Sequence, residues 1–323
     1  ETKFEKKSPA IAEANKLAIR AGYDYAANTH QFANTYTVAP APLEKGTYRS
    51  ISGNVATAWG LCAAAEKAGL PLFCGSYPIT PATVILEELA KRKDLGVKTV
   101  QAEDEIAGIC TAIGAAFAGN FAVTTTSGPG LSLKSEALGL AVMTELPLVV
   151  VDVQRGGPST GLPTKTEQSD LQQALYGRNG ECPVIVVAAS SPSDCFHYAF
   201  EAGRLAMEHM TPVILLTDGF IANGSEPWRI PEMKDYPAIQ PPIVDKAPEG
   251  GFMPYVRNEK LARGWAFPGK VGLEHRVGGL EKDCVKGCIS HDPANHQKMT
   301  DTRAAKVAKV AEDIPAQLSL IHI

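Results

Sequence analysis

Four short stretches of the sequence combine residue types that bind or activate small anionic molecules. The first is residues 77–81, Tyr-Pro-Ile-Thr-Pro, which follow an apolar run and precede a helical pattern. Pro81 suits the first position of a helix, which makes Thr80 a natural N-cap. The Thr80 hydroxyl and the free N–H groups of that helix would then face one spot suited to a carboxylate or a phosphate. The alternative is an ordinary capped helix start without a ligand.

The second stretch, residues 101–105, is acidic and leads from an expected strand into an expected helix. Acidic side chains at a helix N-terminus are stabilised by the helix dipole, by about 0.3–1 kcal/mol each. This structural role suffices for Glu103 and Asp104. Glu105 has an additional feature, because it lies nine residues before Gly114 in the pattern Glu-x8-Gly-Ala-Ala.

The third stretch, residues 124–130, reads Thr-Thr-Thr-Ser-Gly-Pro-Gly and joins a strand to a helix through a tight turn. Glycines there let the backbone approach a ligand closely. The alternative is an ordinary strand-to-helix turn, and a P-loop is excluded because no Gly-Lys-Ser/Thr follows.

The fourth stretch, residues 152–164, follows an apolar strand and contains Arg155 and two adjacent glycines. A guanidinium group fits a carboxylate with two parallel hydrogen bonds, although a surface arginine beside glycines is the simpler interpretation.

The elements that must position these stretches alternate regularly from residue 51 onward. We expect strands at about 71–74, 97–101, 121–126, 147–153, 183–189 and 212–217, and helices at about 55–67, 82–92, 105–118, 131–144 and 193–209. Strands such as 148–151 are apolar on both faces, which is typical of parallel strands covered by helices on both sides. Repeated strand–helix units predict an α/β fold with a doubly wound, mostly parallel sheet. Ligands bind at the carboxyl ends of such strands, where the stretches lie.

The remaining segments are less regular. Residues 8–27 have a helical pattern, and the polar residues 28–51 indicate a linker. After the α/β domain, residues 236–317 are interpreted as an irregular connecting segment that leads to a missing domain. Residues 318–323 match the translation of a transposon end used in DNA library preparation, and we interpret them as a sequencing artefact.

Composition excludes several classes of protein. The chain has 323 residues, of which 45% are hydrophobic and 20% charged, as in a soluble globular protein. Its net charge of −4 gives no reason to expect binding to nucleic acid or an anionic membrane, and no apolar run reaches the roughly 18–20 residues that span a bilayer. The seven cysteines are scattered and odd in number, which fits neither a disulfide framework nor an iron–sulfur ligand run. Cys284 and Cys288 form a Cys-x3-Cys pair that would need two more clustered ligands to bind a metal. We expect a cytoplasmic protein.

Together, in this order and spacing, the four stretches strongly resemble the α subunit of 2-oxoacid:ferredoxin oxidoreductases. The resemblance runs from about residue 53 to 231 and more loosely to 315. Residues 8–27 look like the end of the γ domain that some members fuse ahead of α, so residues 1–50 would be the end of that domain with its linker, and 51–235 the pyrimidine-binding domain. Residues 275–280 and 292–296 resemble γα chains assigned to 2-oxoglutarate.

The resemblance implies a thiamine diphosphate site. Glu105 would exchange a proton with the ring nitrogen of the aminopyrimidine, and Glu103 is the second candidate for this role. Arg155 would pair with the carboxylate of the oxoacid. The other expected site residues line the substrate pocket or shape the pyrimidine pocket: Tyr77, Thr80 and Thr164 for the substrate, and Ser127, Gly128, Pro129 and Gly130 for the cofactor.

The family oxidatively decarboxylates a 2-oxoacid with coenzyme A and reduces ferredoxin. For 2-oxoglutarate the products would be succinyl-CoA and carbon dioxide. The usual Gly-Asp-Gly motif for the diphosphate and its Mg²⁺ does not occur here, nor does a cysteine run for a [4Fe-4S] cluster. Both would come from a β subunit, without which the chain should be inactive. The alternatives are pyruvate or a branched-chain oxoacid as substrate, the pyrimidine domain of another thiamine enzyme, and a non-catalytic α/β scaffold that docks a redox partner.

Overall fold

A computed structural model describes residues 6, 8–32, 34 and 36–316. The chain forms two compact units, Glu1–Gly46 and Thr47–Ile323. In the first unit, helix α2 (Pro9–Thr29) matches the helix predicted over residues 8–27. Residues 318–323, which we interpreted as an artefact, lie outside the described residues.

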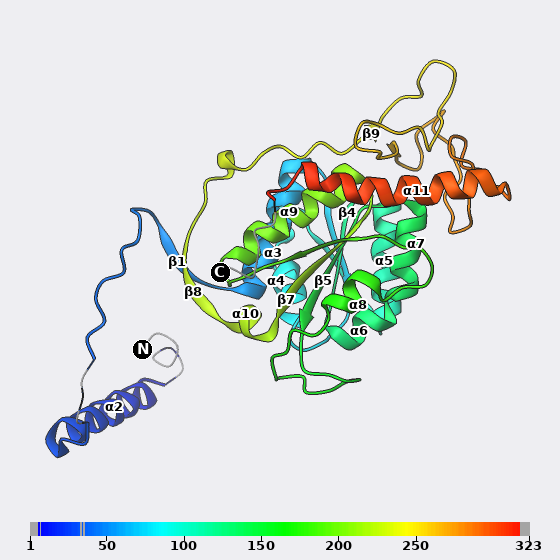
Figure 1. Cartoon of the computed structure of the whole chain (residues 1–323). Helices are drawn as coiled ribbons and strands as arrows, with labels where there is room; N and C mark the ends of the chain where they lie inside the picture. Colours follow the sequence, from blue (N-terminus) through cyan, green and yellow to red (C-terminus); the bar gives the residue numbers. More distant parts are fainter. Residues whose placement is uncertain (1–5, 7, 33, 35, 317–323) are drawn as a thin grey trace. The chain divides into compact units, whose positions relative to one another are not determined.

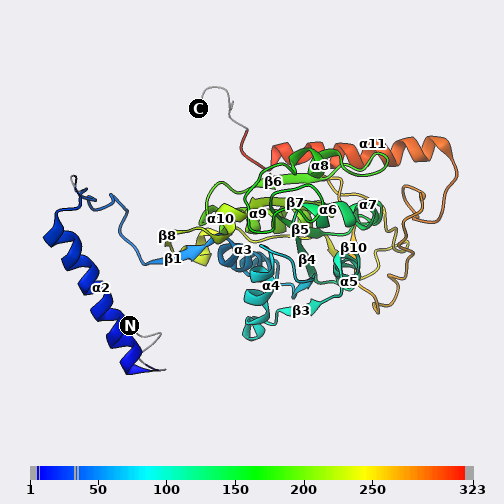
Figure 2. The same ribbon diagram turned by 90° about the horizontal axis from the view of Figure 1, so that it is seen from below.

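The second unit is built on a six-stranded parallel sheet, so the predicted fold class is confirmed (Figures 1 and 2). The strands follow the order β3-β2-β4-β5-β7-β6. Their bounds are Leu72–Ser76 for β2, Lys98–Gln101 for β3, Phe121–Thr126 for β4, Leu148–Gln154 for β5, Ile185–Ala188 for β6 and Pro212–Asp218 for β7. Because all six strands are parallel, the chain returns to the same edge of the sheet after each helix.

Helices cover both faces of the sheet. Their bounds are Gly53–Ala68 for α3, Thr83–Ala90 for α4, Glu105–Phe117 for α5, Gly128–Leu133 for α6, Ser135–Thr144 for α7, Leu171–Tyr176 for α8, Asp194–His209 for α9, Gly219–Asn223 for α10 and Pro293–Lys309 for α11. Figure 1 shows α3, α4 and α9 on one side of the strands and α5 and α7 on the other.

The side chains of each central strand alternate between two apolar cores. In β5, Val149 and Val151 belong to the core formed with α3, α4 and α9, whereas Leu148 and Val150 belong to the core formed with α5, α7 and α8. Helices α3 and α9 approach closely at Gly60, where a Cβ atom would lie 2.2 Å from a backbone oxygen of α9. Both faces of the sheet are therefore buried under helices, as predicted from strands that are apolar on both faces.

The predicted cap at Thr80 is wrong. Helix α4 begins at Thr83, so Pro81 and Ala82 form the turn that precedes it. The Thr83 hydroxyl closes this turn, since it accepts a hydrogen bond from the Ile79 N–H (2.8 Å) and donates one to the Ile79 carbonyl (3.0 Å). A threonine two residues after the proline thus supplies the hydroxyl that we assigned to Thr80.

Two other expectations need correction. The helix predicted over residues 131–144 is interrupted at Lys134, which separates α6 from α7. The linker predicted over residues 28–51 ends in a strand, β1 (Tyr48–Ser52), which pairs antiparallel with β8 (Ser225–Arg229). This pair joins segments about 180 residues apart, and local periodicity carries no signal for such a partner.

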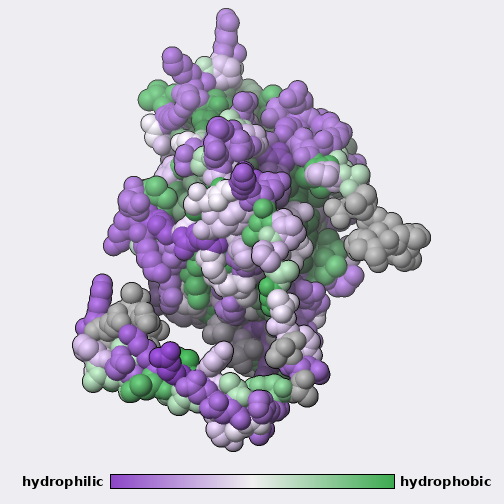
Figure 3. All heavy atoms as spheres, turned by 90° about the vertical axis from the view of Figure 1, so that its left-hand side faces the viewer, coloured by the Kyte–Doolittle hydropathy of each residue, from purple (hydrophilic) through white to green (hydrophobic). Residues whose placement is uncertain are grey.

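Residues 236–292 are largely irregular, as predicted, apart from the short strands β9 (Ile243–Val244) and β10 (Trp265–Ala266) and short turns. The segment is anchored where the Trp265 indole donates to the Ala116 carbonyl (3.1 Å). Helix α11 then runs across the ends of the other helices in Figure 1. Within the described ranges, no helix is long and apolar enough to cross a membrane. The face in Figure 3 is mainly hydrophilic, with hydrophobic atoms in separate small groups, as is normal for a protein surface.

Candidate functional site

The four predicted stretches meet at the carboxyl ends of β3, β2, β4 and β5, which are consecutive neighbours in the sheet. Gly130 lies at the centre of this meeting point. A Cβ atom there would lie 2.3 Å from the Tyr77 hydroxyl oxygen, 2.1 Å from Thr126 Oγ1 and 3.0 Å from Glu105 Cγ. Tyr77 and Thr126 also share a hydrogen bond of 2.9 Å. Only glycine fits at this position, because the turn packs directly against these side chains; the predicted approach of the turn to a ligand stays a prediction.

Glu105 is the first residue of α5 and is half-buried. Asp104 caps the helix, because its carboxylate accepts a hydrogen bond from the Ala107 N–H (2.8 Å). The Glu105 carboxyl group faces the Tyr77 hydroxyl, and burial together with this carboxylate raises the pKa of Tyr77. Glu103, the second candidate, is exposed in the preceding turn. The structure thus favours Glu105 over Glu103 as the carboxyl group directed into the site.

Arg155 is 5% exposed and ties two segments of the site together. One terminal nitrogen donates to the Thr80 carbonyl (2.6 Å) and the other to the Thr160 carbonyl (2.9 Å). A guanidinium group has five N–H donors, so these two bonds leave three N–H groups. One of them, on Nε, is buried without a partner among the described residues. Arg155 therefore both holds the Thr80 backbone and retains donors for an anion.

The turn after β4 is buried and contains an unused polar group. The Ser127 hydroxyl is fully buried and has no hydrogen-bond partner among the described residues. Gly128 packs against the Asp170 carboxyl group, because a Cβ atom there would lie 2.7 Å from Asp170 Oδ2. A cavity of about 380 Å³ opens beside this turn; its lining includes Gly128, Pro129, Arg155, Glu167 and Asp170.

Thr164 lies at the end of the fourth predicted stretch. It is exposed in the loop that follows Arg155 and, like Tyr77, Thr80, Glu105, Ser127 and Gly130, does not line the cavity. That loop is held by a hydrogen bond from the Gly157 N–H to the Glu167 carboxylate (2.7 Å). The role that we expected for Thr164 in binding the far end of a substrate stays a prediction.

Asp152 and Asp170 form a carboxyl pair that we did not single out from the sequence. Asp152 is fully buried near the end of β5, and Asp170 is 7% exposed. Burial, followed by the charge of Asp170, raises the pKa of Asp152 well above its usual value, and burial also raises the pKa of Asp170. Burial and a neighbouring carboxyl group both disfavour the charged form of a carboxylic acid. The signal in the sequence was an aspartate inside the apolar run of β5.

Lys134 was also missed. It is fully buried and donates a hydrogen bond to the Glu105 carbonyl (2.7 Å). Leu131, Lys134 and Leu138 follow the spacing of one buried helix face. A lysine on that face was the signal that could have identified it.

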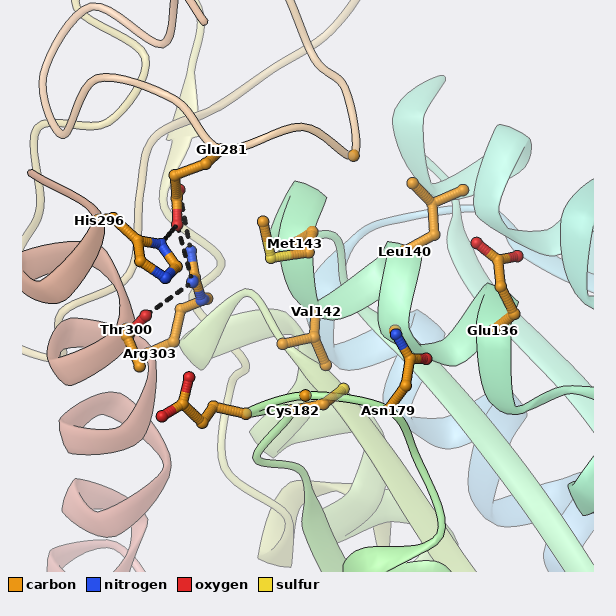
Figure 4. Close-up of a pocket in the computed structure, with 14 residues that line it drawn as sticks. Glu136, Leu140, Val142, Met143, Asn179, Cys182, Glu281, His296, Thr300 and Arg303 are labelled. Carbon is orange, nitrogen blue, oxygen red and sulfur yellow. Dashed lines mark hydrogen bonds and ion pairs between the residues drawn. The ribbon is translucent and has the colours of Figure 1, made fainter. Parts of the chain in front are cut away.

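A second cavity, of about 430 Å³, lies between α7, residues 179–182 and α11 (Figure 4). Glu281, on one side, contacts His296 (2.8 Å) and Arg303 (3.2 Å). None of the predicted site residues lines this cavity. The described part of the chain holds no group of three or more His, Cys, Asp or Glu side chains arranged for a metal.

Comparison with known proteins agrees with this geometry. Residues 64–291 match the family described as pyruvate flavodoxin/ferredoxin oxidoreductase, thiamine diphosphate-binding. The chain belongs to this family. Members of this oxidoreductase family that resemble it include the 2-oxoglutarate oxidoreductase subunit KorA of Mycobacterium tuberculosis, which is 60% identical over 306 residues, or 94% of this chain and 46% of that protein. The 2-oxoglutarate synthase subunit KorA of Methanothermobacter marburgensis is 43% identical over 258 residues, or 80% of this chain and 66% of that protein.

A solved structure from the same group is also similar. It is the 2-oxoglutarate:ferredoxin oxidoreductase from Magnetococcus marinus with 2-oxoglutarate, coenzyme A and succinyl-CoA bound, which superposes with a TM-score of 0.86 at 37% identity and covers 98% of this chain and 54% of that chain. The chain spans about half the length of the curated relatives that it matches most extensively.

The thiamine diphosphate-binding domain of this family fits the residues at the sheet edge. Gly130 lets the turn pack directly against Tyr77 and Thr126, and the Ser127 hydroxyl beside it is a buried group that lacks a partner among the described residues. Glu105 directs a carboxyl group to the same place. These features suit a flat polar ring with a nitrogen that accepts or releases a proton.

Proposed function

We propose that this chain is part of the α subunit of a thiamine-dependent 2-oxoacid:ferredoxin oxidoreductase. The complete enzyme would convert 2-oxoglutarate and coenzyme A into succinyl-CoA and carbon dioxide, with release of a proton and transfer of two electrons to ferredoxin. The observation that carries this proposal is the convergence of Glu105, Tyr77 and Arg155 at one edge of the sheet. The names of the relatives support 2-oxoglutarate as the substrate.

Each residue of the site has a proposed role. Glu105 hydrogen-bonds the ring nitrogen of the aminopyrimidine and exchanges a proton with it, and Ser127, Gly128, Pro129 and Gly130 form the wall against which the ring lies. When bound, thiamine diphosphate supplies the carbanion that attacks the oxoacid and stores the electrons left after decarboxylation. The free N–H groups of Arg155 bind the carboxylate next to the reacting carbonyl.

We place Thr80 and Tyr77 at the border of the substrate site, and Thr164 would reach the far end of the substrate. Because the Arg155 guanidinium binds the Thr80 carbonyl (2.6 Å), the position of Thr80 depends on Arg155. Tyr77 keeps its proton, since burial raises its pKa, and it is therefore available as a hydrogen-bond donor.

We further propose that the rest of the site lies on a β subunit. No Gly-Asp-Gly occurs in the sequence, which supports a partner that holds Mg²⁺, the diphosphate and a [4Fe-4S] cluster and that passes electrons to ferredoxin. Residues 1–50 would be the end of a γ-like domain with its linker, residues 51–235 the pyrimidine-binding domain and residues 236–317 a connecting segment. The odd, scattered cysteines favour a reducing compartment, and we propose a cytoplasmic location.

The substrate assignment is tested with the complete complex and an artificial viologen acceptor. Coenzyme A-dependent reduction should show the highest kcat/KM with 2-oxoglutarate, compared with pyruvate and a branched-chain 2-oxoacid. A preference for pyruvate would contradict 2-oxoglutarate as the substrate but would agree with the proposed type of reaction. Absence of turnover with all three 2-oxoacids would contradict the proposed function.

The role of Glu105 is tested by Glu105→Gln. The amide keeps the shape of the side chain but does not exchange a proton, so kcat should fall by about 10²- to 10⁴-fold, the contribution typical of acid–base catalysis. Glu103→Gln is a matched control, because it removes the same charge two residues away in an exposed turn. Turnover of Glu105→Gln equal to that of the control would exclude Glu105 from the chemistry.

A further inference from the structure

Lys134 occupies the break between α6 and α7 and is 0% exposed. Its ammonium group donates to the Glu105 carbonyl (2.7 Å) and to Thr124 Oγ1 (3.2 Å). It also lies 4.9 Å from the centre of the Tyr77 ring. Burying a lysine is unfavourable unless its charge is well solvated by the protein, so these contacts compensate for removing Lys134 from water.

The three contacts belong to three different segments of the site. Glu105 begins α5, Thr124 lies in β4 and Tyr77 follows β2. One ammonium group therefore fixes the start of α5 relative to the strand and to the aromatic ring that faces the Glu105 carboxyl group. The contact with Glu105 is made to its backbone, which leaves the carboxyl group free for a ligand.

The surroundings of Lys134 also determine its protonation. Burial lowers its pKa to about 8, although Glu105 opposes this shift. Cys74 in β2, Asp104 at the cap of α5 and Cys110 in α5 oppose it more weakly. At neutral pH the group is mainly charged, and it loses its charge as the pH rises through about 8. A charged donor makes a hydrogen bond roughly twice as strong as a neutral one, so the bond to Glu105 weakens over that range.

We propose that Lys134 is a positioning residue that holds Glu105 in place for binding thiamine diphosphate. This inference rests on the proposed function, because it assigns a role relative to the same cofactor. The competing interpretation is that Lys134 supports only the fold. The two interpretations differ in what happens to cofactor affinity when the lysine is removed.

Lys282 provides a matched control elsewhere in the molecule. It is 2% exposed, donates to the Met143 carbonyl (2.8 Å) and lies 5.6 Å from the centre of the Tyr255 ring. Burial lowers its pKa to about 8 as well. Lys282→Met thus removes the same kinds of contact as Lys134→Met, but in the connecting segment rather than beside Glu105.

The test measures the Kd of thiamine diphosphate by titration calorimetry on the complete complex, and the Tm without cofactor. Lys134→Met should raise the Kd by about 10- to 100-fold, by analogy with the loss of affinity when the hydrogen-bond partner of a metal ligand is removed. Lys282→Met should leave the Kd unchanged while lowering the Tm. An unchanged Kd in Lys134→Met, or an equal rise in both variants, would overturn the proposal.

The pH dependence gives a second readout. In the wild type and in Lys282→Met, cofactor affinity should fall as the pH rises through about 8. In Lys134→Arg, which retains a charge that does not titrate in this range, the fall should disappear; this variant serves if Lys134→Met does not fold. A wild-type pH profile in Lys134→Arg would contradict the role of Lys134 alone. Absence of binding by the wild type at every pH would instead overturn the proposed function and this inference together.

Discussion

At the scale of single residues, Arg155 shows how a predicted side chain acquires a second task. The sequence predicted that the Arg155 guanidinium binds a carboxylate. In the structure, two of its N–H groups donate hydrogen bonds to the Thr80 and Thr160 carbonyls. The group is nearly buried, so its geometry is set before a substrate arrives. A rigid arginine loses less conformational entropy on binding than a free surface arginine.

We expect Arg155→Ala to raise the KM for 2-oxoglutarate by about 10- to 100-fold, since hydrogen bonds to a charged partner contribute about 1.5–3 kcal/mol. Steady-state kinetics of the complete complex measures this effect. Arg178→Ala is a suitable control, because Arg178 also donates to backbone carbonyls, those of Ala174 (2.8 Å) and Leu175 (2.7 Å), outside the site. A KM that is the same in both variants would remove Arg155 from substrate binding.

At the scale of elements, buried ion pairs join α11 and the connecting segment to the α/β core. Glu145, at the C-terminus of α7, is 1% exposed in its side chain and pairs with Lys306 of α11 (2.5 Å) and with Arg257 of the connecting segment (2.5 Å). The nearby cations hold the pKa of Glu145 far below its usual value despite burial. Burial is the larger effect at Lys306, whose pKa is lowered to about 8. Glu145 also adopts a φ of 49°, in the region that favours glycine, and its ion pairs explain why a charged residue is kept there.

Glu145→Gln should lower the free energy of unfolding by about 3–5 kcal/mol, because it leaves two buried cations without their counter-charge. Chemical denaturation measures this change, and Asp245→Asn is the control, since Asp245 pairs with Lys270 at an exposed position where the loss should be about 0–1 kcal/mol. Since the native pKa of Glu145 is lowered, its contribution is present above its ordinary pKa of 4.5 and is lost as the pH falls below that value. The stability of Glu145→Gln should therefore depend less on pH in acid than that of the wild type. Equal effects of the two substitutions would contradict this account.

At the scale of the whole molecule, the site lies at the carboxyl ends of the strands. Strand β3, which precedes Glu105, is the outermost strand of the sheet. The residues next to Glu105, including Glu103, Asp104 and Ile106, are exposed. The sequence contains no Gly-Asp-Gly, so a cofactor bound only to this chain would lack the motif that we expect to bind its diphosphate. This arrangement supports the proposal that a second polypeptide completes the site.

We therefore expect the purified chain to show no coenzyme A-dependent reduction of viologen with 2-oxoglutarate, even with added thiamine diphosphate and Mg²⁺. Co-expression with a partner that carries Gly-Asp-Gly and a cysteine cluster should restore turnover, and size-exclusion chromatography should show a complex of the two chains. Turnover by the purified chain alone would show that it holds the diphosphate by itself.

The sequence by itself determined the parallel sheet, because strands that are apolar on both faces have few other stable arrangements. It also identified the four stretches that meet at the site, because the carboxyl ends of parallel strands share one edge. Only the tertiary structure decided which hydroxyl closes the turn before α4, that β1 pairs with β8, and that Thr164 is exposed. It alone revealed the contacts of Lys134 with Glu105, 29 residues away, and of Glu145 with Lys306, 161 residues away. Local patterns report which face of an element is apolar, whereas the partner of a buried charge depends on how distant segments pack.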